Sequence, residues 1–204
     1  MRIRQHVNPN LPFFERLDVE RLALPAGRPV EVEIGCADAQ FLFERAAVDP
    51  ARTYVGLEIR DELVALVNQR AAAAAAPVRA VFCHAQHHLG TLFAPASIER
   101  VYVNFPDPWF KHRHRDRRMV DGRLGDAIVA ALAPGGELLM QTDVWELALD
   151  ALDVFERRDD ALTNLAGAWS FWRRGNPYGV RSWREQNAEE TGLPVWRLRY
   201  RRRG

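Results

Sequence analysis

The sequence is poor in the residues that mark secreted, membrane-bound and metal-dependent proteins. Its 204 residues include two cysteines, Cys36 and Cys83, too few for a disulfide framework or a cysteine-based zinc site. No segment approaches the run of about 20 apolar residues that a membrane-spanning helix needs, and no apolar stretch follows the first charged residues. We therefore expect a cytoplasmic protein with no metal and no membrane partner, whose cysteines are small core residues.

Two glycine-rich signatures of nucleotide binding are also missing. The sequence has no Gly-Lys-Ser or Gly-Lys-Thr, which argues against a P-loop ATPase, and no Gly-x-Gly-x-x-Gly, which argues against a nicotinamide dinucleotide enzyme. Lysine is almost absent, because Lys111 is the only one. The formal net charge of +1 says little about partners, but basic residues gather at 111–118 and 197–203.

A hydrophobic content of 48% with 27% charged residues is typical of a folded domain. Apolar, β-rich runs alternate along the chain with helical patterns, which predicts the α/β class with a mostly parallel sheet and helices on both faces. We expect one domain over residues 1–204, with 1–28 as an N-terminal extension. The predicted strands are 29–34, 54–59, 78–82, 99–103 and 137–141, and the predicted helices are 39–48, 61–75, 122–133 and 144–157.

Two further patterns refine this fold. Pro134-Gly135-Gly136 predicts the stop of a helix and a turn into the next strand. Between Pro194 and Arg201, arginines and a valine alternate with Trp196, Leu198 and Tyr200. This alternation predicts a half-buried strand, antiparallel and near an edge of the sheet.

The loop from Asn104 to Val120, after the fourth predicted strand, is the most informative stretch. Pro106 and Pro108 flank Asp107, so the loop cannot continue a sheet ladder and its carboxylate has little backbone freedom. A Pro-Asp-Pro turn beside a solvated basic face would explain each piece alone. At the carboxyl end of a strand, where open α/β sheets bind ligands, the combination favours a site for a nucleic acid base.

Acidic residues end the first two predicted strands. Glu33 precedes Gly35 where doubly wound folds bind a nucleotide-like ligand, and Gly35 allows the ligand to approach the backbone. Glu58 follows Gly35 by 23 residues, where a carboxylate can accept both ribose hydroxyls, although a solvated strand-end acid would look the same. A ribose acid without a pyrophosphate fingerprint favours S-adenosylmethionine as the cofactor, with Glu33 near its amino acid end.

These residues resemble the family of bacterial tRNA (guanine-N7)-methyltransferases. Asn104 to Trp109 matches the family's Asn-Phe-Pro-Asp-Pro-Trp motif residue for residue, and a basic segment follows it. The resemblance covers roughly residues 30–201 and implies a Rossmann-like, class I S-adenosylmethionine-dependent methyltransferase fold that acts on tRNA. Further matches come in the family's order: Glu33-Ile34-Gly35, Gly56-Leu57-Glu58, Lys111 with Arg117-Arg118, and Thr142-Asp143.

The resemblance also implies roles for single residues. Asp107 resembles the family's proposed catalytic residue. It also resembles a residue that contacts the methyl donor, and Glu33, Gly35 and Glu58 resemble further donor contacts. Lys111 and Asp143 resemble substrate-binding residues, although Asp143 would suit a helix cap before residues 144–157 equally well.

The sequence departs from the family's pattern in three places. Ser182 and Glu185 keep the hydroxyl and the carboxylate of its Thr-x-Phe-Glu segment, and they resemble further substrate-binding residues. His84 stands where the family has Asn or Asp near the adenine, and its imidazole can still offer a hydrogen bond. Ala37 and Ala39 replace two glycines of the family's first loop, so we expect a negative φ at both.

The mechanism that the resemblance implies is an in-line attack of guanine N7 on the donor's methyl group. Because N7 already carries a lone pair, catalysis needs alignment, desolvation and electrostatics rather than a strong base. Trp109 would stack on the base and the arginines at 113, 115, 117 and 118 would bind phosphates. A methyltransferase for another RNA or a small molecule, and a non-catalytic RNA-binding relative, remain alternatives. We expect a monomer or a weak homodimer.

Overall fold

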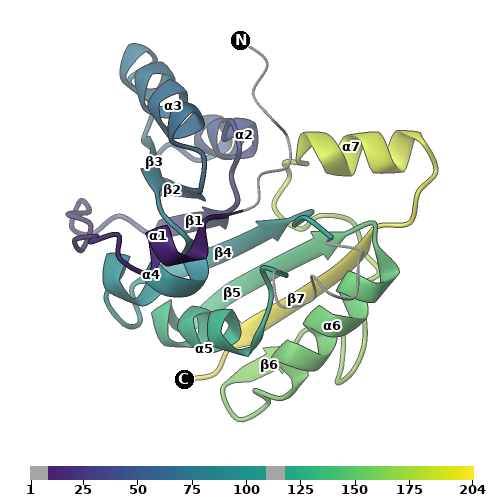
Figure 1. Cartoon of the computed structure of the whole chain (residues 1–204). Helices are drawn as coiled ribbons and strands as arrows, with labels where there is room; N and C mark the ends of the chain where they lie inside the picture. Colours follow the sequence, from purple (N-terminus) through teal and green to yellow (C-terminus); the bar gives the residue numbers. More distant parts are fainter. Residues whose placement is uncertain (1–8, 109–117) are drawn as a thin grey trace.

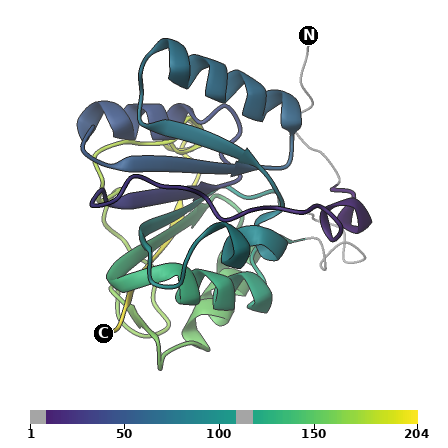
Figure 2. The ribbon, with the colours of Figure 1, turned by 90° about the vertical axis from the view of Figure 1, so that its left-hand side faces the viewer.

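A computed structural model describes residues 9–108 and 118–204 of the chain. They form a seven-stranded sheet in the order β3-β2-β1-β4-β5-β7-β6, with helices on both faces (Figures 1 and 2). The predicted α/β class, with a mostly parallel sheet and an antiparallel C-terminal strand, is confirmed.

The first five strands run parallel, and β7 runs antiparallel to both of its neighbours. The strands are β1 (Val30–Ile34), β2 (Thr53–Glu58), β3 (Val78–Phe82), β4 (Ile98–Asn104), β5 (Leu132–Thr142), β6 (Leu162–Asn164) and β7 (Trp196–Arg202). The helices are α1 (Leu11–Phe14), α2 (Gln40–Val48), α3 (Asp61–Ala73), α4 (Ala85–Leu92), α5 (Gly122–Ala131), α6 (Trp145–Glu156) and α7 (Trp183–Glu190).

Two apolar clusters cover the two faces of the sheet. Side chains of α4, α5 and α6 pack on one face, and side chains of α2 and α3 pack on the other. Every residue of β1 and β2 is buried, because these central strands are covered from both sides. Cys36 and Cys83 are buried free thiols, as predicted.

Several elements differ from the prediction. α1, α4, α7 and β6 were not predicted, and the Gly and two His of α4 explain why its propensity signal is weak. α5 ends at Ala131 and β5 begins at Leu132, because Leu132 already pairs with Ile98. Pro134-Gly135-Gly136 therefore lies inside β5, where the pairing with β4 shifts register, and the predicted boundary was wrong.

The strand order reverses between β1 and β4. β2 and β3 follow β1 on one side, whereas β5 and β7 follow β4 on the other. Connections leave the carboxyl ends of β1 and β4 in opposite directions, and open α/β sheets bind their ligands in the crevice that this creates. Glu33 is the last residue but one of β1, and Asn104 is the last residue of β4.

Part of the predicted N-terminal extension packs near this edge. Phe14 is buried, and its ring centroid lies 5.4 Å from that of Phe82 and 5.5 Å from that of His84. The backbone N–H of Leu22 donates to the carbonyl of Leu92 at 2.9 Å. The described part of the extension is therefore held against β3 and α4.

Candidate active site

Glu33 is buried at the end of β1, with one oxygen engaged and one left over. Its Oε1 accepts a hydrogen bond from Asn104 Nδ2 at 2.8 Å, and among the described residues its Oε2 has no hydrogen-bond partner. Burial raises the pKa of Glu33 to about 8, and the nearby acids Asp38 and Glu58 add to this effect. A cation placed beside Oε2 would therefore favour ionisation of this carboxyl group.

Glu58, the predicted ribose acid, is enclosed by protein donors at the end of β2. Its carboxylate accepts from the backbone N–H groups of Ala37, Ile59 and Arg60 at 2.9, 2.9 and 3.0 Å. The guanidinium of Arg60 donates to both oxygens, at 2.8 Å to Oε1 and 2.9 Å to Oε2. The two carboxylate oxygens that were predicted to accept the ribose hydroxyls are thus engaged by Nε and Nη2 of Arg60.

Arg60 also connects the end of β2 with the loop after β4. The hydrogen bonds to Glu58 raise the pKa of Arg60, and the charge of Asp107 raises it further. The carboxylate of Asp107 therefore lies within electrostatic range of the group that covers Glu58. The charged groups at the ends of β2 and β4 are therefore close enough to interact.

The loop after β1 adopts a strained backbone. Gly35 has φ +75°, and Ala37 and Ala39 have φ 50° and 54°, so the predicted negative φ at both alanines was wrong. The left-handed region costs an L-residue roughly 1–2 kcal/mol. Phe105 has φ 47° in the first position after β4. Such strain tends to gather at functional sites, and here it marks both loops of the crevice.

His84 caps the N-terminus of α4 at the same edge of the sheet. It is buried, and its Nδ1 has no hydrogen-bond partner among the described residues. Burial lowers its pKa to about 4, and His87 and His88 contribute to this shift. The imidazole is therefore neutral at pH 7, with Nδ1 available to a ligand as donor or acceptor according to the tautomer.

The acid loop is described from Phe105 to Pro108 and again from Arg118. The N–H of Phe105 donates to the carbonyl of Gln141 at 2.8 Å, which joins the start of the loop to β5. Arg118 forms an ion pair with Asp150 of α6. The predictions for Trp109, Lys111 and the arginines at 113, 115 and 117 lie outside the described residues.

Asp143 joins the end of β5 to α7 rather than capping α6. Its carboxylate forms an ion pair with Arg184 at 2.5 Å and is 11% exposed. Val144 is the N-cap of α6, and its N–H bonds the hydroxyl of Thr142 at 3.1 Å. The helix-cap alternative is therefore wrong, and the carboxylate of Asp143 is engaged by Arg184 of α7.

Ser182 and Glu185 are both used inside the protein. Ser182 is the N-cap of α7, where its hydroxyl accepts from the N–H of Glu185 at 3.2 Å. The carboxylate of Glu185 is fully buried and accepts hydrogen bonds from Gln141, Asn176 and Arg197. The spacing Ser-x-x-Glu, a common signature of a helix N-terminus, was a signal for this cap in the sequence.

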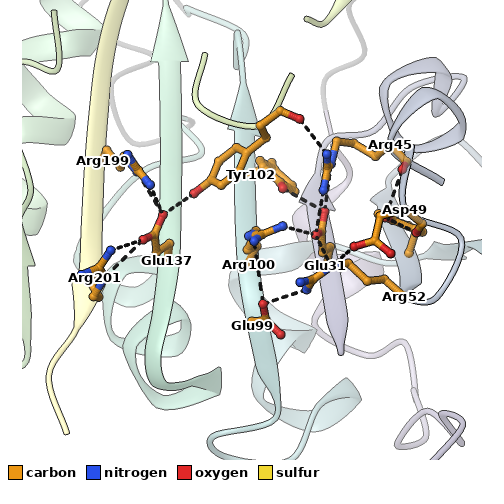
Figure 3. Close-up of polar contacts among 12 residues, drawn as sticks. Glu31, Arg45, Asp49, Arg52, Glu99, Arg100, Tyr102, Glu137, Arg199 and Arg201 are labelled. Carbon is orange, nitrogen blue, oxygen red and sulfur yellow. Dashed lines mark hydrogen bonds and ion pairs between the residues drawn. The ribbon is translucent and has the colours of Figure 1, made fainter. Parts of the chain in front are cut away.

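A buried charged network on the α2 face of the sheet was missed from the sequence (Figure 3). Glu31 is fully buried and forms ion pairs with Arg100 at 2.6 Å, Arg45 at 3.1 Å and Arg52 at 3.4 Å. Across the sheet, Glu137 pairs with Arg199 and Arg201 and accepts from the hydroxyl of Tyr178. A glutamate between two valines in a buried strand was the available signal for Glu31.

Aromatic rings cluster beside Asp143 at the same end of β5. The ring centroids of Trp145 and Trp196 are 4.4 Å apart, and that of Phe171 lies 5.5 and 5.3 Å from them. Trp196 pairs with Thr142 in the sheet, which places the cluster at the ligand edge. Trp145 is 45% exposed. Exposed aromatic surface next to a crevice is typical of a binding site.

Within residues 9–108 and 118–204, no group of three or more His, Cys, Asp or Glu side chains could hold a metal ion. In the same part of the chain, no helix has the length and apolarity to cross a membrane.

Comparisons with known proteins identify the family of the chain. A family model described as "Putative methyltransferase" matches residues 27–198. Two similar curated relatives are both named tRNA (guanine-N(7)-)-methyltransferase. One, from Parasynechococcus marenigrum (strain WH8102), is 38% identical over 98% of this chain and 88% of its own length. The other, from Synechococcus sp. (strain WH7803), is 39% identical over 98% and 87%.

Solved structures support the fold. A precorrin-6y C5,15-methyltransferase from Geobacter metallireducens GS-15 aligns with a TM-score of 0.53 and 16% identity, over 90% of this chain and 82% of that chain. At this identity the likeness concerns the fold alone. It agrees with a class I methyltransferase architecture.

Proposed function

The chain belongs to the family of tRNA (guanine-N7)-methyltransferases, and we propose that it transfers a methyl group from S-adenosylmethionine to N7 of a guanine in tRNA. The observation that carries this proposal is the meeting of two acids through Arg60, which binds Glu58 and feels the charge of Asp107. We infer that the donor site and the acceptor site share this edge of the sheet. We expect the protein to act in the cytoplasm, as a monomer or a weak homodimer.

The polar atoms left over in the crevice fit the methyl donor. Glu33 Oε2 would accept from the ammonium group of the methionine part, and His84 would bond the adenine. Gly35 has no side chain to block the backbone, and Glu58 would accept the ribose hydroxyls once Arg60 moves away. When bound, S-adenosylmethionine supplies an electrophilic methyl group on a sulfonium.

On the acceptor side, Asp107 would act as the catalytic residue. Guanine N7 has its own lone pair, so the carboxylate need not remove a proton. It would accept hydrogen bonds from the guanine edge and offset the positive charge that develops on the purine. The flanking prolines hold it in place for this role.

Several other residues would hold the RNA. We assign Lys111 and Asp143 to substrate binding, and Ser182 and Glu185 to the position of α7 beside it. The aromatic cluster of Trp145, Phe171 and Trp196 offers a surface on which an unpaired base can stack. A base of folded tRNA must leave its stack before it can react, so such a surface helps to hold it.

The test is to incubate the purified protein with total tRNA and isotope-labelled S-adenosylmethionine, then to cleave the RNA chemically at 7-methylguanine. We expect cleavage at a defined guanine. Label in RNA without such cleavage would favour another target base. Donor binding without label in any RNA would favour a small-molecule substrate, and no binding at millimolar donor would favour a non-catalytic RNA-binding protein.

The role of Asp107 can be tested separately with Asp107→Ala. We expect kcat to fall by about 10²- to 10³-fold, the usual cost of one electrostatic contact to a transition state, with tRNA and donor binding retained. Asp126→Ala is the control, because Asp126 is an exposed acid on α5. Wild-type turnover in Asp107→Ala would rule out the catalytic assignment.

A further inference from the structure

A row of buried and half-buried polar groups runs across the carboxyl ends of β1, β4 and β5 and the amino end of β7, and it reaches α7. Asn104 Nδ2 donates to Glu33 Oε1 at 2.8 Å, and Asn104 Oδ1 accepts from Gln141 Nε2 at 2.9 Å. Gln141 Nε2 also donates to Glu185 Oε2 at 2.9 Å, and Gln141 Oε1 accepts from Arg197 Nε at 3.2 Å. Asn104 and Gln141, the amide pair, thus connect the donor acid with the helix beside the acceptor site.

The chemistry of its two ends determines the direction of each hydrogen bond in the row. A guanidinium can only donate, so the side of Gln141 that faces Arg197 must be its carbonyl oxygen. The NH₂ group of Gln141 then faces both Glu185 and Asn104. Asn104 must present its own oxygen to Gln141 and its NH₂ group to Glu33. Gln141 is fully buried, and every polar position of its side chain is used.

The amide pair therefore decides what Glu33 can do. With Oε1 held by an N–H donor, Oε2 is the oxygen of Glu33 that has no hydrogen-bond partner among the described residues. We propose that Gln141 is a positioning residue of the methyl-transfer site, which acts through Asn104 to keep Glu33 an acceptor for the donor's ammonium group. The identity of this ligand rests on the proposed function, whereas the effect of Gln141 on Glu33 does not.

The charged groups around the row fit this role. Glu33 faces Asp38 from the loop after β1 and Glu58 from the end of β2, both of which disfavour its ionisation, and the Asn104 hydrogen bond is the group that favours it. At the other end, Arg197 pairs with Glu185 at 2.7 Å and with Glu189 at 2.6 Å. Loss of the Asn104 donor would leave Glu33 among acids alone.

Gln141→Glu is the sharpest test, because it changes one NH₂ group into an oxygen. A carboxylate at position 141 cannot donate, so Asn104 must turn its NH₂ group toward it and present oxygen to Glu33. Glu33 would then have to keep its proton in order to donate. By calorimetry with S-adenosylmethionine between pH 6 and 9, we expect at least tenfold weaker binding at pH 7.5. The midpoint of the pH dependence should rise by a pH unit or more.

A second measurement needs no donor. Because the folded protein holds the Glu33 proton up to about pH 8 and the unfolded chain releases it near pH 4.5, the free energy of unfolding should fall as pH rises through this window. In urea unfolding, Glu33→Gln should remove this slope, and Gln141→Glu should extend it to higher pH. A slope unchanged by Gln141→Glu would overturn the proposal.

Gln186→Glu is the matched control, because Gln186 is on α7 and donates only to the carbonyl of Arg181 at an exposed site. It adds the same charge and should leave both pH profiles unchanged. If Gln141→Glu does not fold, Gln141→Met keeps the size and removes the hydrogen bonds. Wild-type donor affinity and pH midpoint in Gln141→Met would overturn the proposal. A wild type that binds no donor at any pH would refute the proposed function instead, with the donor-free profile still testing Gln141.

Discussion

The side chain of Arg60 binds the carboxylate of Glu58, which the ribose of a methyl donor would need as its acceptor. Its guanidinium binds both oxygens of Glu58, and the pair is largely buried. A donor whose ribose binds Glu58 must therefore displace this side chain, and part of the binding free energy is spent on breaking a bidentate ion pair.

We predict that Arg60→Ala binds S-adenosylhomocysteine about tenfold more tightly than the wild type, a change of about 1.4 kcal/mol. The backbone donors of Ala37 and Ile59 would still orient the Glu58 carboxylate. Titration calorimetry measures the change, and Arg60→Lys, which keeps the charge without the fork, should give an intermediate affinity. Weaker binding by Arg60→Ala would show instead that Arg60 contacts the ligand.

The alanines of the first loop carry strain that glycine would remove. Ala37 has φ 50°, so Ala37→Gly should stabilise the protein by about 0.5–1 kcal/mol, after allowance for the greater freedom of glycine in the unfolded chain. Urea unfolding measures this difference. Ala72→Gly, at an exposed position within α3, should have the opposite sign and cost about 1 kcal/mol. Destabilisation by Ala37→Gly would mean that the methyl group's contacts outweigh the backbone strain.

At the scale of elements, α7 positions Glu185 through its cap. Ser182→Ala should lower the free energy of unfolding by about 1 kcal/mol, because the N–H of Glu185 loses its acceptor. Ser170→Ala is the control, because the Ser170 hydroxyl donates only to the carbonyl of Ala168 at an exposed site within the described chain. It should change the free energy of unfolding by less than about 0.5 kcal/mol. Well below the melting temperature, methylation kinetics separate the two roles of Ser182. A large rise in KM for tRNA would indicate a substrate contact, and unchanged kinetics a purely structural cap.

The elements also show how far the sequence predicts this fold. The strands of the parallel sheet were found because their apolar runs are long and end at turns, and Val78–Phe82 was predicted with its observed bounds. α7 was missed because its residues are almost all polar, and tertiary contacts of Glu185 and Ala188 hold it instead. The end of α5 was misplaced because pairing of Leu132 with β4 outweighs the local turn signal.

The same limit applies to the site. Single acids at strand ends, such as Glu33 and Glu58, could be located from their position after a strand and from the resemblance. Two features depend on which side chains meet in the folded chain: the ion pair between Glu58 and Arg60, and the hydrogen bonds that link Gln141 through Asn104 to Glu33. That information lies in the register of β1, β4, β5 and β7, and it is not contained in any local pattern.

At the scale of the whole molecule, one sheet face is organised in two polar rows. The inner row contains Glu31, Arg100 and Glu137 (Figure 3), and the outer row, two residues further along β1 and four along β4 and β5, contains Glu33, Asn104 and Gln141. The inner row is saturated with arginine and tyrosine partners, whereas Glu33 in the outer row has one oxygen that no residue of the described part of the chain contacts by a hydrogen bond. The saturated charged groups and the half-satisfied carboxyl group of Glu33 are thus separated along the strands.

The aromatic cluster at the end of β5 should hold RNA through base stacking rather than through charge. Trp145 begins α6 two residues after Asp143, packs on Trp196 and exposes almost half of its surface. Base stacking on an aromatic side chain is worth about 1–3 kcal/mol, so Trp145→Ala should raise KM for tRNA about tenfold. Donor affinity should stay unchanged, and Trp145→Phe should retain part of the effect. Leu149→Ala is the matched control, an exposed apolar residue one turn further along α6. Equal effects of Trp145→Ala and Leu149→Ala would show that apolar area, and not stacking, holds the substrate.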